Sequence, residues 1–148
     1  MNRYSASRAL TLVTAAAAAL VALAGCAQHT RTEPISEISV RALYESLSAD
    51  PDAIFVDVRT PQEWQGQRAQ GVTHFIEYDQ IGGRHQELGA SKSRTIYLIC
   101  RSGRRSMIAA QTLRDLGYEH TVNVSGGTNA WVAEGLPTES GSPPTDQP

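Results

Sequence analysis

The chain has 148 residues, of which 41% are hydrophobic and 19% charged, and its net charge is -2. This composition is typical of one soluble globular domain and excludes a wholly disordered chain. Arg3 and Arg8 precede the first acidic residue, so removing residues 1–25 leaves 11 of the 13 basic residues against 15 acidic ones. The resulting net charge of -4 argues against nucleic acid as a partner, because phosphate contacts need a basic surface.

The first 25 residues have the pattern of an export signal. Arg3 and Arg8 form a positive N-terminal region, and the apolar run "ALTLVTAAAAALVALA" follows over residues 9–24. The next motif, "LAGC" at residues 23–26, resembles the lipobox of bacterial lipoproteins. There, a diacylglycerol is attached to the cysteine and the chain is cut before it. An ordinary secretory signal and an uncleaved membrane helix are the alternatives, although a bilayer-spanning helix needs roughly 20 apolar residues.

A lipobox makes Cys26 the first mature residue and a lipid anchor to a membrane. Ala27, in place of an aspartate, then favours the outer membrane of the cell envelope, facing the periplasm. Cys100 is the only other cysteine and would have no disulfide partner. Because disulfides form readily in an exported compartment, such a thiol is either buried and inert or retained for its reactivity.

Composition divides the rest of the chain into three parts. Residues 26–34 read as the lipidated cysteine and a polar tether, and residues 139–148 as a disordered tail rich in proline, serine and glycine. The folded domain should therefore occupy residues 35–138.

The first half of this domain begins with a helix pattern. Ser39 can cap a helix whose apolar residues Val40, Leu43, Tyr44 and Leu47 follow a helical period. The run "AIFVDV", residues 53–58, predicts a buried strand. The sequence Thr60-Pro61-Gln62-Glu63 predicts a second helix with a capping box.

The second half continues the alternation. Residues 71–76 ("GVTHFI") and 95–100 ("TIYLIC") predict strands, and residues 121–124 ("TVNV") another. Between the last two, one helical face should carry Ile108, Ala109, Thr112, Leu113 and Leu116, with Gly117 ending the helix. A glycine turn, a short helix and a Gly-Leu-Pro stop complete the domain. Alternating strands and helices predict an α/β fold with a mostly parallel sheet.

Cys100 is the residue with the clearest chemical signal. It ends a strand and precedes a helix, and ligands of α/β sheets gather at that edge. Backbone N–H groups of residues 101–105, a turn at Gly103 and the helix dipole all favour a thiolate and an incoming anion. Arg101, Arg104 and Arg105 add positive charge. On these residues alone, a buried inert cysteine before a solvated basic loop is the alternative.

Three motifs narrow the choice: "IFVDVRTPQEW", "CRSGRRS" and "NVSGGTNAWVAEGLP" occur in this order. Together they resemble a single-domain rhodanese, a sulfurtransferase family, over residues 35–138. The resemblance implies a five-stranded, mostly parallel α/β sheet flanked by helices and a persulfide on Cys100. It implies a small anionic sulfur donor such as thiosulfate and an acceptor that is a thiol, a protein or cyanide. It implies no cofactor. The persulfide would lie in a loop of Arg101, Ser102, Gly103, Arg104 and Arg105, with Asp57, Arg59 and Ser106 supporting that loop.

Loop length separates this family from a related one. The spacing from Cys100 to Arg105 is Cys-x4-Arg. A related branch, which resembles the cell-cycle dual-specificity phosphatases, uses Cys-x5-Arg, and the residue one position later in this chain is Ser106. The shorter loop favours sulfur over a phosphoryl group. A non-catalytic binding or redox-sensing module and an arsenate reductase of rhodanese type stay as alternatives. His74, His85 and His120 lack metal-ligand spacing, so no metal is expected.

One segment departs from the family pattern. Residues 67–72 read "QRAQGV" where the family usually has Gly-His-Ile-Pro-Gly-Ala, and only Gly71 is retained. Arg68 replaces the family histidine, so this chain is expected to differ at the rim of the site.

Overall fold

The computed structural model describes residues 33–141, and the predicted export signal, Cys26 and most of the tether and tail lie outside them. Within this range no helix combines the length and apolarity needed to cross a membrane. In chain order the elements are β1 (Ser36–Ile38), α1 (Val40–Ala49), β2 (Ile54–Asp57), α2 (Pro61–Gly66), β3 (Arg68–Ala69), β4 (His74–Phe75), α3 (Ile81–Arg84), the 3-10 helix η1 (His85–Leu88), β5 (Thr95–Ile99), α4 (Arg104–Asp115), β6 (His120–Val124), α5 (Gly127–Ala133) and β7 (Thr138–Glu139).

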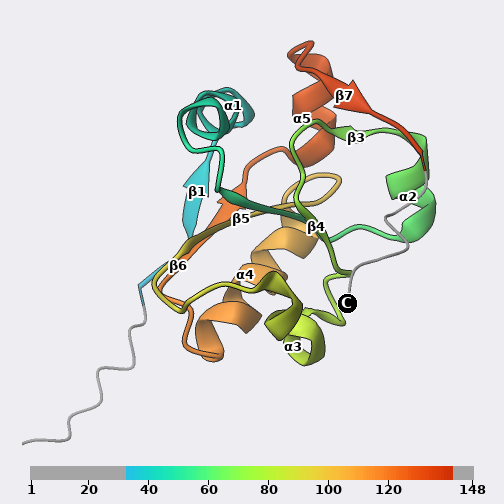
Figure 1. Ribbon diagram of the computed structural model, residues 1–148. Coiled ribbons are helices and arrows are strands. Elements are labelled where there is room, and N and C mark those ends of the chain that lie inside the picture. The colour runs from blue at the N-terminus through green and yellow to red at the C-terminus, as the bar shows by residue number, and fades with distance from the viewer. Residues whose placement is uncertain (1–32, 142–148) are drawn as a thin grey trace, which may run out of the picture. The chain divides into compact units, whose positions relative to one another are not determined.

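A five-stranded sheet in the order β1-β6-β5-β2-β4 forms the centre of the domain (Figure 1). Its four strand pairings are all parallel, which confirms the predicted α/β class and sheet. β5 is the middle strand, between β6 and β2. Because the carboxyl ends of parallel strands share one edge, the residue that follows β5 lies at the centre of that edge.

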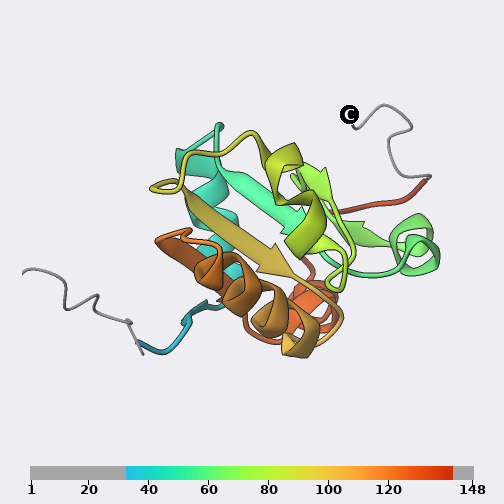
Figure 2. The same cartoon turned by 90° about the horizontal axis from the view of Figure 1, so that it is seen from below.

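Helices cover both faces of the sheet. α1 and α5 lie on one face, and α3 and α4 lie on the other, from which Figure 2 views the domain. Each face has its own apolar core. The α1/α5 core contains Val40, Leu43, Phe55, Ala69, Ile99, Val124, Trp131 and Leu136. The α3/α4 core contains Val56, Val58, Ile76, Ile81, Leu88, Ile96, Leu98, Cys100, Ala109, Ala110, Leu113 and Tyr118.

The two predicted helix starts are confirmed. Ser39 caps α1, and its hydroxyl accepts a hydrogen bond from the Ala42 N–H at 3.3 Å. Thr60 begins α2 with a full capping box: its hydroxyl accepts from the Glu63 N–H, and the Glu63 carboxylate accepts from the Thr60 N–H.

Two predictions about the elements need correction. The strand predicted over residues 71–76 is shorter and consists of β4 alone; Gly71 lies outside it, since its φ of +88° is not that of an extended strand. The predicted apolar face of α4 is also partly wrong, since Ile108 is 49% and Leu116 39% exposed. The buried face instead runs through Ser106, Ala109, Ala110 and Leu113. A serine therefore occupies a core position that an apolar pattern could not reveal.

The segment that departs from the family pattern joins the domain to its C-terminal strand. β3 pairs antiparallel with β7, and β7 includes Glu139, the first residue of the predicted tail. The Arg68 guanidinium lies 4.6 Å from the centre of the Trp64 ring and forms an ion pair with Glu139 at 3.2 Å. Arg68 thus packs on α2 and does not reach the loop after β5.

Candidate active site

Cys100 follows β5 at the carboxyl edge of the sheet, where the strand pattern placed it. The residue is 1% exposed, so its sulfur lies beneath the loop rather than on the surface. The Gly103 N–H donates to Sγ at 3.1 Å, and the Ser106 hydroxyl lies 3.3 Å from the same atom. The loop therefore presents hydrogen-bond donors to a buried sulfur.

Local backbone conformation closes the loop over this sulfur. Gly103 has a φ of +97° and serves as the N-cap of α4. A Cβ at this position would lie 3.4 Å from the Val124 carbonyl oxygen, an ordinary van der Waals contact, so the positive φ and not a lack of space favours glycine here. Arg101, Ser102 and Arg104 are exposed, and Arg105 is half-buried.

The start of α5 holds the other side of the loop. The Thr128 N–H donates to the Cys100 carbonyl at 2.8 Å, and the Asn129 N–H donates to the Arg101 carbonyl at 3.1 Å. A Cβ on Gly127 would lie 2.2 Å from the Cys100 carbonyl oxygen and 2.6 Å from the Arg101 carbonyl carbon. Only a glycine at position 127 permits this approach.

The surroundings of Cys100 shift the pKa of its thiol in opposite directions. Burial raises the pKa, but hydrogen bonds from the Ser106 hydroxyl and from the backbone N–H groups of Ser106, Ser102 and Gly103 lower it more. The net result is a pKa below the usual value for cysteine. A larger fraction of Cys100 is therefore thiolate at neutral pH, and the thiolate is the nucleophilic form.

Arg105 forms a two-point ion pair with Glu63 on α2. Its Nη1 and Nη2 donate to the two carboxylate oxygens at 2.8 and 2.7 Å. The hydrogen bonds from Arg105 lower the pKa of Glu63 to about 2, although partial burial opposes this shift. The pKa of Arg105 is raised by Glu63 and, to a smaller degree, by the thiolate of Cys100. Arg105 therefore links α2 to the cysteine.

Replacing Glu63 with glutamine should make the domain less stable in a pH-dependent way. A carboxyl whose pKa is depressed in the folded state stabilises that state above its unfolded pKa, 4.5, and loses the contribution as pH falls towards 2. Because Glu63 is 27% exposed, solvent screening limits the difference at pH 7 to about 1–2 kcal/mol. Urea unfolding of both proteins measures it, and the difference should shrink between pH 5 and pH 2; an equal difference at every pH would contradict this account.

Asp57 and Arg59 form a second, deeply buried ion pair at the end of β2. The Arg59 Nη2 lies 2.7 Å from Asp57 Oδ2, and the Arg59 backbone N–H also donates to Asp57 Oδ1. Their side chains are only 5% and 0% exposed. The intervening Val58 N–H donates to the Ile99 carbonyl, directly before Cys100. The pair thus lies beside the cysteine in the adjacent strand end.

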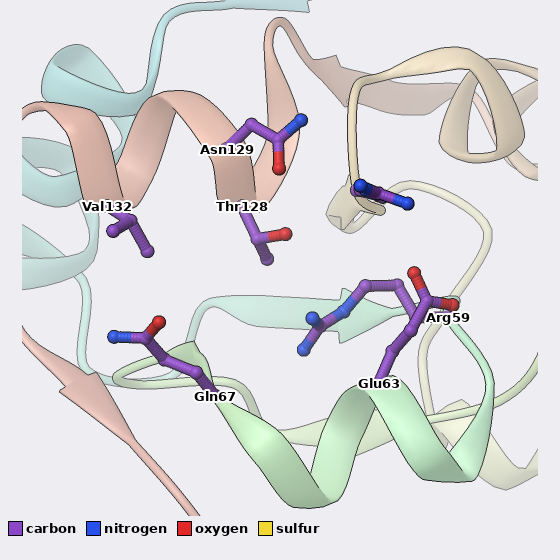
Figure 3. A pocket seen from close by; sticks show the side chains of 7 residues that line it. Arg59, Glu63, Gln67, Thr128, Asn129 and Val132 are labelled. Carbon is purple, nitrogen blue, oxygen red and sulfur yellow. The ribbon is translucent and has the colours of Figure 1, made fainter.

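A cavity of about 520 Å³ adjoins the loop, between α2 and α5 (Figure 3). Glu63 on α2 and Gln67 directly after that helix line one side, and Thr128, Asn129 and Val132 line it from α5. Arg59 and Arg101 complete the lining. Within residues 33–141, Arg101 has no ion-pair partner, so its positive charge is available to an anion in this cavity.

The structure brings most of the predicted site residues together. The Cys100 sulfur accepts hydrogen bonds from Gly103 and Ser106, and it interacts electrostatically with Arg105. Arg101 and Arg59 line the adjoining cavity. Arg104 is exposed and lines neither. Cys26 lies outside the described residues. Between residues 33 and 141 there is no group of three or more His, Cys, Asp or Glu side chains arranged to hold a metal ion.

Besides Thr128 and Asn129 in the cavity lining, the sequence prediction missed three polar residues of the hydrogen-bond network around the loop. The capping-box pattern predicts only a helix cap for Glu63, yet its carboxylate also accepts hydrogen bonds from Arg105. Asn123 on β6 accepts from the Ser106 hydroxyl at 2.6 Å, and Glu37 on β1 accepts from the Asn123 amide at 3.4 Å. The signal that could have revealed Asn123 is a polar residue within a strand that is otherwise apolar, as in "TVNV".

Comparison with known proteins assigns the fold to a family. Residues 39–134 match the rhodanese-like domain family. The chain is 35% identical over 106 residues to a sulfurtransferase of Allochromatium vinosum, which covers 70% of this chain and 94% of that protein. It is 34% identical over 100 residues to the YrkF protein of Bacillus subtilis. The aligned region covers 68% of this chain but only 52% of YrkF, so the chain spans about half of that relative.

A solved structure gives the same assignment. The thiosulfate sulfurtransferase of Pseudomonas aeruginosa superposes with a TM-score of 0.63 at 25% identity, over 73% of this chain and 20% of that one. The parallel five-stranded sheet and the cysteine loop after its middle strand agree with these matches. The chain belongs to the rhodanese-like domain family.

Proposed function

We propose that this protein is a sulfurtransferase that carries a sulfane sulfur on Cys100 between an anionic donor such as thiosulfate and a thiophilic acceptor. The observation that carries the proposal is the buried Cys100 sulfur, which receives hydrogen bonds from the loop and has a lowered thiol pKa. Family membership and the similarity to the Allochromatium vinosum sulfurtransferase support it.

The first transfer loads the enzyme. The Cys100 thiolate attacks the outer sulfur of thiosulfate and forms an S–S bond, while the S–S bond of the donor breaks and its electron pair leaves with sulfite. One negative charge then resides on the outer sulfur of the persulfide. Arg101 can attract the donor dianion to the cavity, and Arg105 offsets the charge of the thiolate.

The second transfer unloads the enzyme. A nucleophile such as cyanide or a thiolate attacks the outer sulfur, and the electron pair of the breaking S–S bond returns to Cys100 as its thiolate. The hydrogen bonds from Gly103 and Ser106 stabilise this leaving group. The same donors therefore serve both transfers, first by keeping the nucleophile ionised and then by accepting the returning charge.

Two separate transfers predict ping-pong kinetics. Initial rates measured over a matrix of thiosulfate and cyanide concentrations should give parallel double-reciprocal lines. Lines that intersect would mean that both substrates must be bound together, and the persulfide mechanism would be wrong. Binding of thiosulfate without any turnover would instead favour a non-catalytic module.

We further propose that Cys26 anchors the protein by lipid to the cell envelope, with the domain in the periplasm. The support is the sequence alone: a positive start, an apolar run over residues 9–24 and the "LAGC" motif. Membrane fractionation of cells expressing wild type and Cys26→Ala tests this. The variant should leave the membrane fraction, and its retention there would point to an uncleaved signal helix.

A further inference from the structure

The Ser106 hydroxyl has one proton and three acceptors within reach. Its Oγ lies 2.6 Å from Asn123 Oδ1, 3.1 Å from the Gly103 carbonyl oxygen and 3.3 Å from Cys100 Sγ. Ser106 is fully buried, so water does not supply a further partner from the surface. The hydroxyl can therefore donate to only one of these atoms at a time.

The side chain of Asn123 is held with its oxygen towards Ser106. Its Nδ2 donates to Glu37 Oε1 at 3.4 Å, and the Ser125 hydroxyl donates to Glu37 Oε2 at 2.6 Å. An ionised carboxylate only accepts hydrogen bonds, so the amide nitrogen must face Glu37. Asn123 Oδ1 is consequently a permanent acceptor beside the Ser106 hydroxyl.

The charge on Cys100 Sγ changes during the proposed transfers. In the sulfur-free enzyme Sγ is a thiolate and a strong acceptor. In the loaded enzyme Sγ is bonded to two atoms, and the negative charge resides on the outer sulfur. The best acceptor for the Ser106 proton should therefore change from Sγ to Asn123 Oδ1 when sulfur is loaded.

We propose that Asn123 and Glu37 are positioning residues that compete with the Cys100 thiolate for the Ser106 proton and so favour the sulfur-loaded enzyme. This inference rests on the proposed sulfur transfer. In the sulfur-free state Ser106 must give up its bond to Asn123 to stabilise the thiolate. In the loaded state it keeps that bond, and Asn123 thereby favours loading relative to the free thiolate.

Removing the competing acceptor should make the thiolate more stable. In Asn123→Leu, which is close in size, the Ser106 hydroxyl is free to donate to Sγ, and the pKa of Cys100 should fall by about half to one pH unit. Ser106→Ala removes the donor and should raise that pKa. The ultraviolet absorbance of the thiolate, titrated against pH in the sulfur-free protein, measures both.

The combined variant tests whether Asn123 acts through Ser106. In the Ser106→Ala background, Asn123→Leu should leave the pKa of Cys100 unchanged, because no proton remains to compete for. Asn123→Ala removes the same acceptor without the bulk of leucine and tests the proposal if Asn123→Leu fails to fold; it too should lower the pKa only while Ser106 is present. Equal effects in both backgrounds, or a raised or unchanged pKa in Asn123→Leu, would overturn the proposal.

Other charges near the cysteine are the same in every one of these comparisons. They are Arg101 in the loop, Arg105 on α4, Glu63 on α2 and the Asp57–Arg59 pair after β2. Thr121→Val is the matched control. Thr121 lies two residues before Asn123 in β6, is fully buried, and its hydroxyl has no hydrogen-bond partner among the described residues. The Thr121→Val variant should have the same Cys100 thiol pKa as the wild type.

A second measurement follows the loaded state directly. At a pH above the Cys100 pKa of both proteins and at a fixed ratio of thiosulfate to sulfite, the ratio of persulfide to free enzyme should be roughly three- to tenfold lower in Asn123→Leu than in wild type, matching the pKa shift. An unchanged ratio would overturn the bias towards loading. Because the pKa titration needs no sulfur donor, it remains decisive for the Asn123–Ser106 competition even if thiosulfate transfers no sulfur.

Discussion

Cys100→Ser is expected to abolish sulfur transfer, with a loss of roughly a thousandfold or more, while the domain stays folded. A serine hydroxyl is not ionised by the hydrogen bonds and charges that surround this position, and it forms no persulfide. The side chain is 1% exposed but small, so the free energy of unfolding should change by only about 1 kcal/mol. Cyanide-dependent release of thiocyanate measures the activity, and urea unfolding measures the stability.

Arg104→Ala is a useful control for that experiment. Arg104 is the first residue of α4, directly after the loop, but its side chain is exposed and lines neither the sulfur nor the cavity. It should retain most of the transfer rate. Residual transfer by Cys100→Ser within tenfold of wild type would mean that another group carries the sulfur.

Gly127→Ala is expected to lower both stability and activity, by roughly 3 kcal/mol or more in unfolding free energy. The residue has a φ of +58°, which disfavours a side chain, and its Cβ would lie 2.2 Å from the Cys100 carbonyl oxygen. The atoms that the Cβ would approach belong to the backbone of Cys100 and Arg101 in the loop, and not to a flexible side chain that could turn away. The loop must therefore move away from α5, and the hydrogen bonds to Cys100 Sγ should lengthen with it.

Gly135→Ala separates strain from contact. Gly135 has a similar φ, +66°, but nothing lies within 4 Å of its Cβ position. It should cost only the backbone strain, about 1 kcal/mol, and leave activity unchanged. Equal losses in the two alanine variants would show that the approach of α5 to the loop has no role in holding the site.

Local patterns predicted most of the fold. Strand residues such as those of "AIFVDV" and "TIYLIC" have high β propensity, and the caps at Ser39 and Thr60 depend only on near neighbours. The α4 face was partly wrong because the pattern counted apolar residues, whereas the domain buries Ser106 and exposes Ile108. Tertiary contacts, and not helix periodicity, decide which side of α4 faces the sheet.

The site could be predicted only where its residues are close in sequence. The loop from Cys100 to Ser106 is one segment, and the placement of Cys100 follows from the strand before it. The partners of that loop come from elsewhere: Glu63 contacts Arg105 across 42 positions, and Asn123 contacts Ser106 across 17. Gly127 looked like an ordinary turn residue, because its approach to Cys100 exists only in the folded chain.

Intact mass spectrometry of the purified protein after incubation with thiosulfate tests the central claim most directly. The account predicts that the mass increases by one sulfur atom, that peptide mapping places this sulfur on Cys100, and that cyanide removes it. Cys100→Ser should show no increase. No added sulfur with thiosulfate or any other sulfane donor, or an adduct that persists in Cys100→Ser, would contradict sulfur transfer through Cys100.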